Sequence, residues 1–130
     1  MAWLVARMKW IMLASGLLTL TMLQAAIAPA AALRALFGEA IEAGPLAEIV
    51  VRNWGALIAL IGAMLVYGAF RPQVRGLVLV VAGLSKLVFI ALMLGLGGRY
   101  LGHQAGLAIA IDALMVLLFA AYLLTGRRAV

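Results

Sequence analysis

Cysteine is absent from this chain of 130 residues, and histidine occurs once, at His103. Without cysteine there is no disulfide, no thiolate metal site and no cysteine nucleophile. A single histidine cannot ligate a haem on both faces, and its place in a short connection predicts a solvent-facing side chain. The G-x-S-x-G, H-E-x-x-H and nucleotide-binding glycine motifs are also missing. We therefore expect no metal, no cofactor and no enzymatic activity.

Acidic residues are scarce as well: 4 Asp and Glu stand against 10 Lys and Arg, giving a formal net charge of +6. On a soluble protein this balance would favour nucleic-acid binding. However, 68% of the residues are hydrophobic and the mean hydropathy is +1.24, more than a soluble domain of this length can bury. We expect an integral membrane protein whose basic residues meet lipid headgroups, and no nucleic-acid partner.

Four stretches are long and apolar enough to cross a bilayer as helices, which takes about 20 residues each. They cover about residues 8–28, 53–70, 76–96 and 105–125. Prolines and glycines separate them, and no repeat or change of composition marks a domain boundary. The sequence predicts a single transmembrane domain over residues 1–130, an all-α, integral membrane four-helix bundle.

The first stretch has a second interpretation, as a cleaved signal peptide. Arg7 and Lys9 precede it, and the A-x-A pattern of cleavage sites occurs at Ala26–Ala28 and at Ala28–Ala30. Because the apolar run is long for the core of a signal peptide, we favour an uncleaved span.

The basic residues predict the orientation of the spans. One side of the membrane receives only basic residues, namely Arg7, Lys9, Arg71, Arg75, Arg127 and Arg128. The other side receives both signs, namely Arg34, Arg52 and Arg99 with Glu39, Glu42 and Glu48. Since the side rich in lysine and arginine faces the cytoplasm, we expect both termini to be cytoplasmic.

The first outer connection is the longest, and Pro29 opens an amphipathic pattern in it. Its apolar stripe consists of Leu33, Leu36, Phe37 and Ile41. Arg34, Glu39 and Glu42 lie off this stripe. We expect a short helix at the membrane surface that reaches Ala43 and covers the outer end of the bundle as a lid. Pro45 then suits the first turn of the second membrane helix.

Small residues recur along three of the spans. The rows are Gly55, Ala59, Gly62 and Ala69; Ala82, Gly83, Ala91 and Gly95; and Gly106, Ala113 and Ala120. Small residues let membrane helices approach closely. We interpret the rows as packing within the chain, with contact between copies in a homo-oligomer as the alternative.

Lys86 and Asp112 stand inside two consecutive membrane spans. A charge at the centre of a membrane helix costs about 2.5–3.5 kcal/mol on insertion scales. The two residues lie at similar depths, so we expect an ion pair inside the bundle. Further polar or aromatic residues are candidates for the mouth of a pocket opening to the outer leaflet, namely Gln24, Arg52, Asn53 and Trp54. The pair is either a structural lock of helix register or the floor of that pocket.

A pocket of this kind suits a lipid-like or amphiphilic ligand, or a helix of a partner membrane protein. The first function hypothesis is therefore a non-enzymatic binding protein. The alternative is a proton-coupled transporter or channel, acting as an oligomer, in which Asp112 takes up protons. The inner halves of the spans carry few polar residues, which favours binding over a continuous path.

The motif R-N-W-G at Arg52–Gly55, the small size, the four spans and the long first outer loop resemble the DoxX-like group of small four-helix bacterial membrane proteins. The similarity covers most of the chain. It implies a bacterial inner membrane location and, as a further alternative, a membrane subunit linked to quinone redox chemistry. No site residue is carried over from the group.

Overall fold

The structure is a computed structural model that describes residues 2–39, 42 and 44–128. All regular structure in these residues is helical, in the order α1 (Ala2–Leu20), α2 (Leu23–Ile27), α3 (Pro29–Phe37), α4 (Pro45–Phe70), η1 (Pro72–Val74), α5 (Arg75–Leu96), η2 (Gly98–Tyr100) and α6 (Gln104–Arg128). Four helical segments are long and apolar enough to cross a membrane: α1 with α2, α4, η1 with α5, and α6. This confirms the predicted all-α class and indicates an integral membrane protein.

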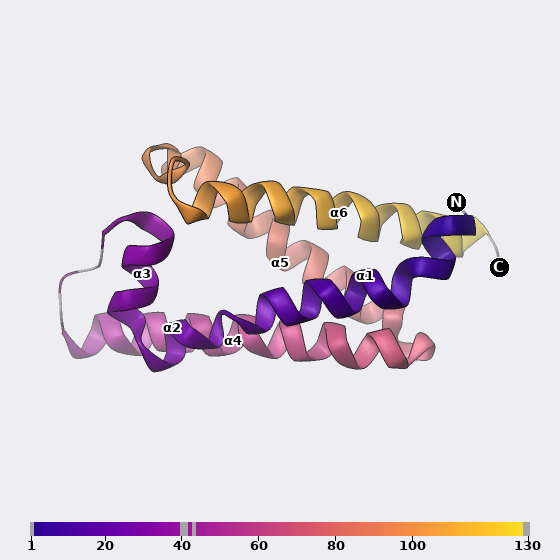
Figure 1. The fold of residues 1–130 in the computed structure, drawn as a ribbon, viewed down its shortest axis with the longest axis horizontal. Helices are drawn as coiled ribbons and strands as arrows, with labels where there is room; N and C mark the ends of the chain where they lie inside the picture. The colour runs from indigo at the N-terminus through magenta and orange to yellow at the C-terminus, as the bar shows by residue number, and fades with distance from the viewer. Residues whose placement is uncertain (1, 40–41, 43, 129–130) are drawn as a thin grey trace.

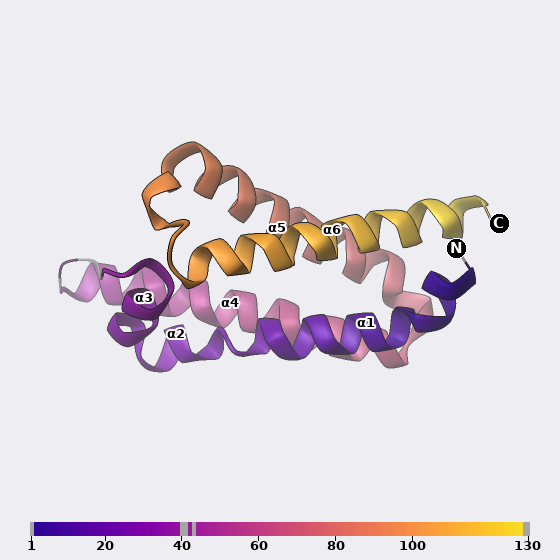
Figure 2. The ribbon, with the colours of Figure 1, turned by 45° about the horizontal axis from the view of Figure 1, so that its top comes forward.

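The long helices form two pairs. α1 and α2 lie along α4, and α5 lies along α6 (Figure 1). α5 begins beside the end of α4 and diverges from it towards the opposite end of the molecule, as a second view also shows (Figure 2). α1 begins and α6 ends at the same end, which we call the terminal end. α3 lies at the other end, which we call the α3 end.

Most large buried side chains gather at the terminal end and join the two pairs. This terminal-end cluster consists of Leu4, Met8, Met12, Leu65, Ala69, Val78, Leu79, Ala82 and Phe119. A smaller cluster at the α3 end consists of Ala25, Ala32, Leu33 and Val51. The first cluster draws on α1, α4, α5 and α6, whereas the second draws on α2, α3 and α4 alone. The two pairs are therefore packed together mainly at the terminal end.

Glycines bring α1 and α4 into backbone contact. A Cβ atom on Gly62 would lie 2.7 Å from the backbone nitrogen of Leu20, and one on Gly16 would lie 2.8 Å from the carbonyl oxygen of Gly62. Real Cβ atoms do not approach backbone that closely, so only glycine fits at these two positions. The predicted row on the second span, which includes Gly62, is buried within the chain.

The predicted row on the third span behaves differently. A Cβ atom on Gly83 or Gly95 would meet no other group within 4 Å, and Ala91 is exposed. Of this row only Ala82 is fully buried. Close packing of small residues therefore holds α1 to α4, and it does not hold α5 to α6.

The first predicted span is interrupted at Thr21 and Met22, between α1 and α2. The Thr21 hydroxyl donates to the Leu18 carbonyl oxygen, and the backbone N–H groups of Thr21 and Met22 form bonds of the i to i+3 kind. A side chain that competes for helix carbonyls bends a helix, and hydropathy alone does not reveal this competition. α1 also begins at Ala2, ahead of the predicted start at Met8, because a helix can continue past the apolar part that the bilayer requires.

α3 begins at Pro29, where the amphipathic pattern was predicted to start, and ends at Phe37. Gly38 follows with φ 80° and donates its N–H to the Arg34 carbonyl oxygen. Glycine adopts this left-handed conformation without strain, which ends the helix there. The described helix is thus shorter than the one predicted, while residues 40, 41 and 43 of the predicted helix lie outside the described residues.

Candidate functional site

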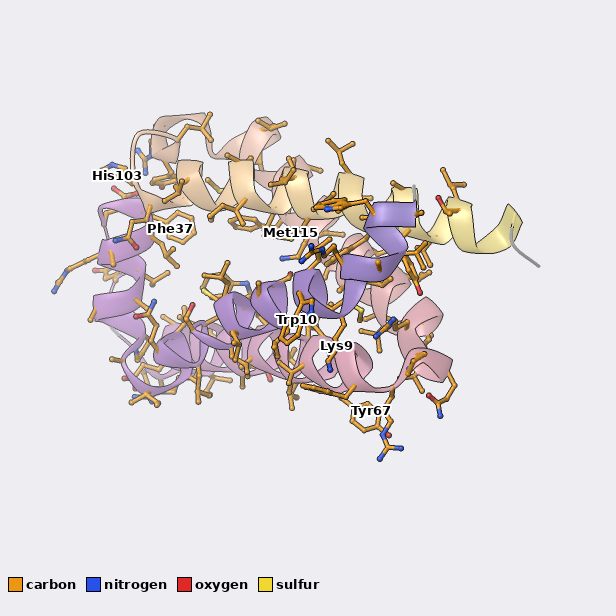
Figure 3. The ribbon with its side chains drawn as sticks, turned by 45° about the vertical axis from the view of Figure 1, so that its right-hand side comes forward. Lys9, Trp10, Phe37, Tyr67, His103 and Met115 are labelled. Carbon is orange, nitrogen blue, oxygen red and sulfur yellow. The ribbon has the colours of Figure 1, made fainter. Side chains whose placement is uncertain are left out.

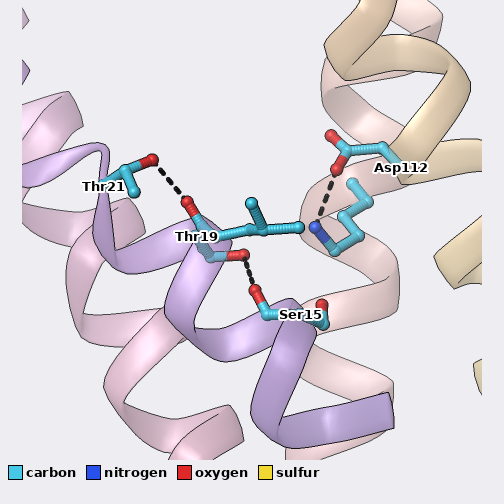
Figure 4. Close-up of polar contacts among 6 residues, drawn as sticks. Ser15, Thr19, Thr21 and Asp112 are labelled. Atoms are coloured by element: carbon cyan, nitrogen blue, oxygen red, sulfur yellow. Dashed lines mark hydrogen bonds and ion pairs between the residues drawn. The ribbon is translucent and has the colours of Figure 1, made fainter.

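Lys86 of α5 and Asp112 of α6 form a direct ion pair inside the membrane segments. The Lys86 Nζ atom lies 2.8 Å from the Asp112 Oδ1 atom (Figure 4). The two side chains are only 10% and 19% exposed. The contact that the sequence predicted between these two charges is therefore present in the structure.

The helix periodicity places both residues on the α3 side of the terminal-end cluster. Lys86 follows Ala82 by one turn of α5, and Asp112 precedes Met115 by one turn of α6. Ala82 belongs to the terminal-end cluster and Met115 packs against it. An ammonium group has three donors and a carboxylate has two acceptor oxygens. Among the described residues, the hydrogen bond between Lys86 and Asp112 is the one side-chain hydrogen bond that either residue makes. Both partners therefore keep unused hydrogen-bonding capacity.

Ser15 of α1 is a third buried polar group, and it follows Met12 of the terminal-end cluster by about one helical turn. The residue is 2% exposed, and its hydroxyl has no hydrogen-bond partner among the described residues. In Figure 4 the side chain of Ser15 points to the side of α1 on which Asp112 lies. Buried polar groups without a partner are uncommon in proteins. We call Ser15, Lys86 and Asp112 the polar layer.

Sequence reasoning did not select Ser15 as a site residue, although its spacing carries a signal. Met8, Met12 and Ser15 follow one stripe of α1, and all three are buried. Thr19 follows Ser15 by one turn, and its hydroxyl donates to the Ser15 carbonyl oxygen over 2.7 Å. A serine that interrupts a buried apolar stripe is the pattern that would have found it.

Arg52, a predicted mouth residue, is used to cap a helix. Its Nη1 atom lies 2.6 Å from the carbonyl oxygen of Ala26 and 3.3 Å from that of Ile27. These carbonyls end α2, where backbone acceptors lack helical partners and carry partial negative charge. Glu48 lies 3.6 Å away on the same side of α4, at the predicted i,i+4 spacing. Arg52 thus anchors α2 to α4.

The other predicted mouth residues do not contact the polar layer through hydrogen bonds. Trp54 is half-buried, and its ring centroid lies 6.5 Å from that of Phe37. Gln24 and Asn53 are exposed. Among the described residues no hydrogen bond or ion pair joins Gln24, Arg52, Asn53 or Trp54 to the polar layer. The pocket mouth therefore stays a prediction.

A second polar contact, at the α3 end, was not expected from the sequence. Glu39 accepts hydrogen bonds from the Tyr100 hydroxyl and from the Arg99 guanidinium. The Tyr100 hydrogen bond and the charge of Arg99 hold the pKa of Glu39 below its ordinary value. The Phe37 ring packs edge-on against Tyr100, with centroids 5.4 Å apart. We call Phe37, Glu39, Arg99 and Tyr100 the α3–η2 contact.

This contact links the two helix pairs at the α3 end. Phe37 reaches both Trp54 of α4 and Tyr100 of η2, while His103 lies near Phe37 in the loop before α6 (Figure 3). The side chain of His103 is exposed, as the sequence predicted. Because a residue pair separated by about sixty positions leaves no periodic signal, sequence reasoning had no means of finding it.

The chain matches no known protein family, no curated protein and no solved structure. The resemblance to the DoxX-like group therefore stays a prediction. Function has to be argued from the polar layer itself.

Proposed function

We propose that this protein is a non-enzymatic integral membrane protein that binds the polar head of an amphiphile at the polar layer. The observation that carries the proposal is the Lys86–Asp112 ion pair inside the membrane segments. Ionisable groups at such depth are costly and mark ligand or ion sites by default. We further propose a bacterial inner membrane location with both termini cytoplasmic, on the basis of the basic residues at the terminal end.

The chemistry of the polar layer selects a class of head group. Lys86 and Asp112 neutralise each other, so a charged head would leave an unbalanced charge in the membrane. An uncharged head with both donors and acceptors, such as a hydroxyl, carbonyl or amide, satisfies the spare Lys86 donors, the second Asp112 oxygen and the Ser15 hydroxyl together. A neutral, hydrogen-bonding amphiphile therefore fits this site best.

The packing favours binding over transport. Met8, Met12, Leu65 and Phe119 are at most 1% exposed, and they lie between the polar layer and the terminal end. A proton or ion path would need buried polar groups in that region, and in the described part of the chain the buried polar or charged residues are Ser15 and Lys86, both in the polar layer. Binding from the α3 side needs no such path. Membrane lipids are the expected partners. The alternative is contact between two copies of the chain through the outward-facing Gly83 and Gly95, since small residues let membrane helices approach closely.

Native mass spectrometry of the protein released from detergent micelles tests the proposal. We expect a co-purified amphiphile on the wild-type protein and lower occupancy on Ser15→Ala, because losing one hydrogen bond of about 1 kcal/mol weakens the affinity about fivefold. Ser85→Ala is the matched control. It is half-buried next to Lys86 but rotated by about 100° on α5, and it should retain the ligand.

The double variant Lys86→Met with Asp112→Leu keeps an apolar interior and should lose the amphiphile. If the double variant carries as much amphiphile as the wild type, binding occurs elsewhere. If the wild-type protein carries none, the ion pair is a structural lock of helix register.

A further inference from the structure

A shallow groove of about 330 Å³ lies at the terminal end, between α1 and α6. Trp3, Arg7, Trp10, Ile11 and Ala14 of α1 form one wall, and Met115 and Leu118 of α6 form the other. Trp3, Arg7, Trp10 and Ala14 recur every three or four positions, so they share one face of the helix. Figure 3 shows Met115 between α6 and α1, close to the level of Trp10.

The α1 wall of the groove extends from the headgroup level into one membrane leaflet. Trp3 and Ala14 are eleven residues apart, or about 16 Å along the helix. The hydrocarbon core of a bilayer is about 30 Å thick, so one leaflet contributes about half of that. Trp3 and Trp10 are 65% and 58% exposed, and tryptophan is enriched at the level of the lipid headgroups.

Arg7 is the basic residue among those that line this groove, and it lines the groove with apolar atoms of its side chain. Three other cations of the terminal end already have partners: Lys9 lies over two aromatic rings, Arg71 lies over one, and Arg75 donates to two carbonyl oxygens of α4. Arg7 makes no hydrogen bond or ion pair with the part of the chain that the structure describes. None of the four acidic residues of the chain belongs to this end.

We infer that the groove binds one phospholipid with an anionic headgroup. Its phosphate meets the Arg7 guanidinium, which presents a fork of donors that matches phosphate oxygens. One acyl chain follows the apolar wall from Trp10 to Ala14 and Met115, and it ends on the terminal-end side of Asp112. This site selects negative charge, whereas the polar layer selects a neutral head, so the inference does not depend on the proposed function.

Lipid titration of the full-length protein, followed by native mass spectrometry, tests the inference. Phosphatidylglycerol is compared with phosphatidylcholine of the same acyl chains. We expect tighter binding of phosphatidylglycerol, and we expect Arg7→Gln to weaken that binding about fivefold, the ratio that one arginine at a membrane surface typically gives. Arg71→Gln, at the same end but outside the groove, should change it little, and Arg7→Lys should restore part of it.

A second pair of variants tests the acyl-chain part of the site. Ala14→Phe fills the groove and should weaken both lipids, while Ala6→Phe, on an exposed position of α1 outside the groove, should not. Thermal melts of both variants establish that they remain folded. Equal losses for Arg7→Gln and Arg71→Gln, no preference for phosphatidylglycerol in the wild type, or full binding by a folded Ala14→Phe would each overturn the inference.

Discussion

The two helix pairs of this protein are held together by different means. α1 and α4 meet backbone to backbone at Gly16 and Gly62. α5 and α6 have no such seam, since Gly83 and Gly95 face away from other groups, and they share the Lys86–Asp112 ion pair instead. Within a bilayer the hydrophobic effect does not drive helices together, so association depends on close packing or on polar contacts. α1 and α4 associate through close packing, whereas α5 and α6 share a polar contact.

The difference has a consequence for function. Glycine packing depends on shape alone, so the α1–α4 pair should be insensitive to ligands and pH. An ion pair depends on charge and on the hydrogen bonds around it, so the α5–α6 pair should respond to a polar ligand. We therefore regard α1 with α4 as the scaffold and α5 with α6 as the part that binding stabilises.

Breaking the ion pair on one side should have the largest effect. Asp112→Ala leaves the Lys86 ammonium without its partner, and removing one member of a buried pair costs about 3–5 kcal/mol. The double variant Lys86→Met with Asp112→Leu should lose much less, because it strands no charge. Thermal or denaturant unfolding in detergent measures both. Losses from Lys86→Met and Asp112→Leu that add up to the loss of the double variant would show that the two residues are not coupled.

Adding one methyl group to the glycine seam should have an intermediate effect. Gly62→Ala places a Cβ atom 2.7 Å from the backbone of α1, and overpacking typically costs about 1–3 kcal/mol. Gly83→Ala is the matched control: its Cβ meets no other group within 4 Å, and alanine is the better helix former by about 1 kcal/mol. The two changes should therefore shift the unfolding midpoint in opposite directions. If both variants shifted the unfolding midpoint by the same amount in the same direction, the difference between the glycine contact of α1 with α4 and the open surface at Gly83 would be contradicted.

The sequence was informative where the signal is local or periodic. Hydropathy located all four spans, and the unusual presence of Lys86 and Asp112 in apolar surroundings was enough to predict their contact. The small-residue rows could not show which rows face another helix, because α5 turns Gly83 outward while α4 turns Gly62 inward. The same limit applies to Arg52, whose contact with the end of α2 depends on how α2 bends after Thr21.

The smallest effect is expected at the α3–η2 contact, which joins the two pairs across exposed side chains. The pKa of Glu39 lies below its ordinary value of 4.5, first because of the Tyr100 hydrogen bond and then because of Arg99. A lowered folded-state pKa means that the folded protein binds this proton less readily than the unfolded chain. The contact is therefore complete at neutral pH and is lost as the pH falls through the lowered folded-state value.

Spin labels can follow this loss, because the chain has no cysteine of its own and introduced cysteines at Ala35 and Gly102 are unique. At neutral pH the distance between the labels should be narrowly distributed, and it should broaden as the pH falls through the folded-state pKa of Glu39, which lies below the ordinary value of 4.5. Glu39→Gln should be broader at neutral pH and should not change on acidification, whereas Glu48→Gln, which removes an ion pair within α4, should behave as the wild type. The midpoint of global unfolding should change little in Glu39→Gln, since exposed ion pairs contribute little to stability. A distribution in Glu39→Gln that still broadens on acidification would assign the transition to another group.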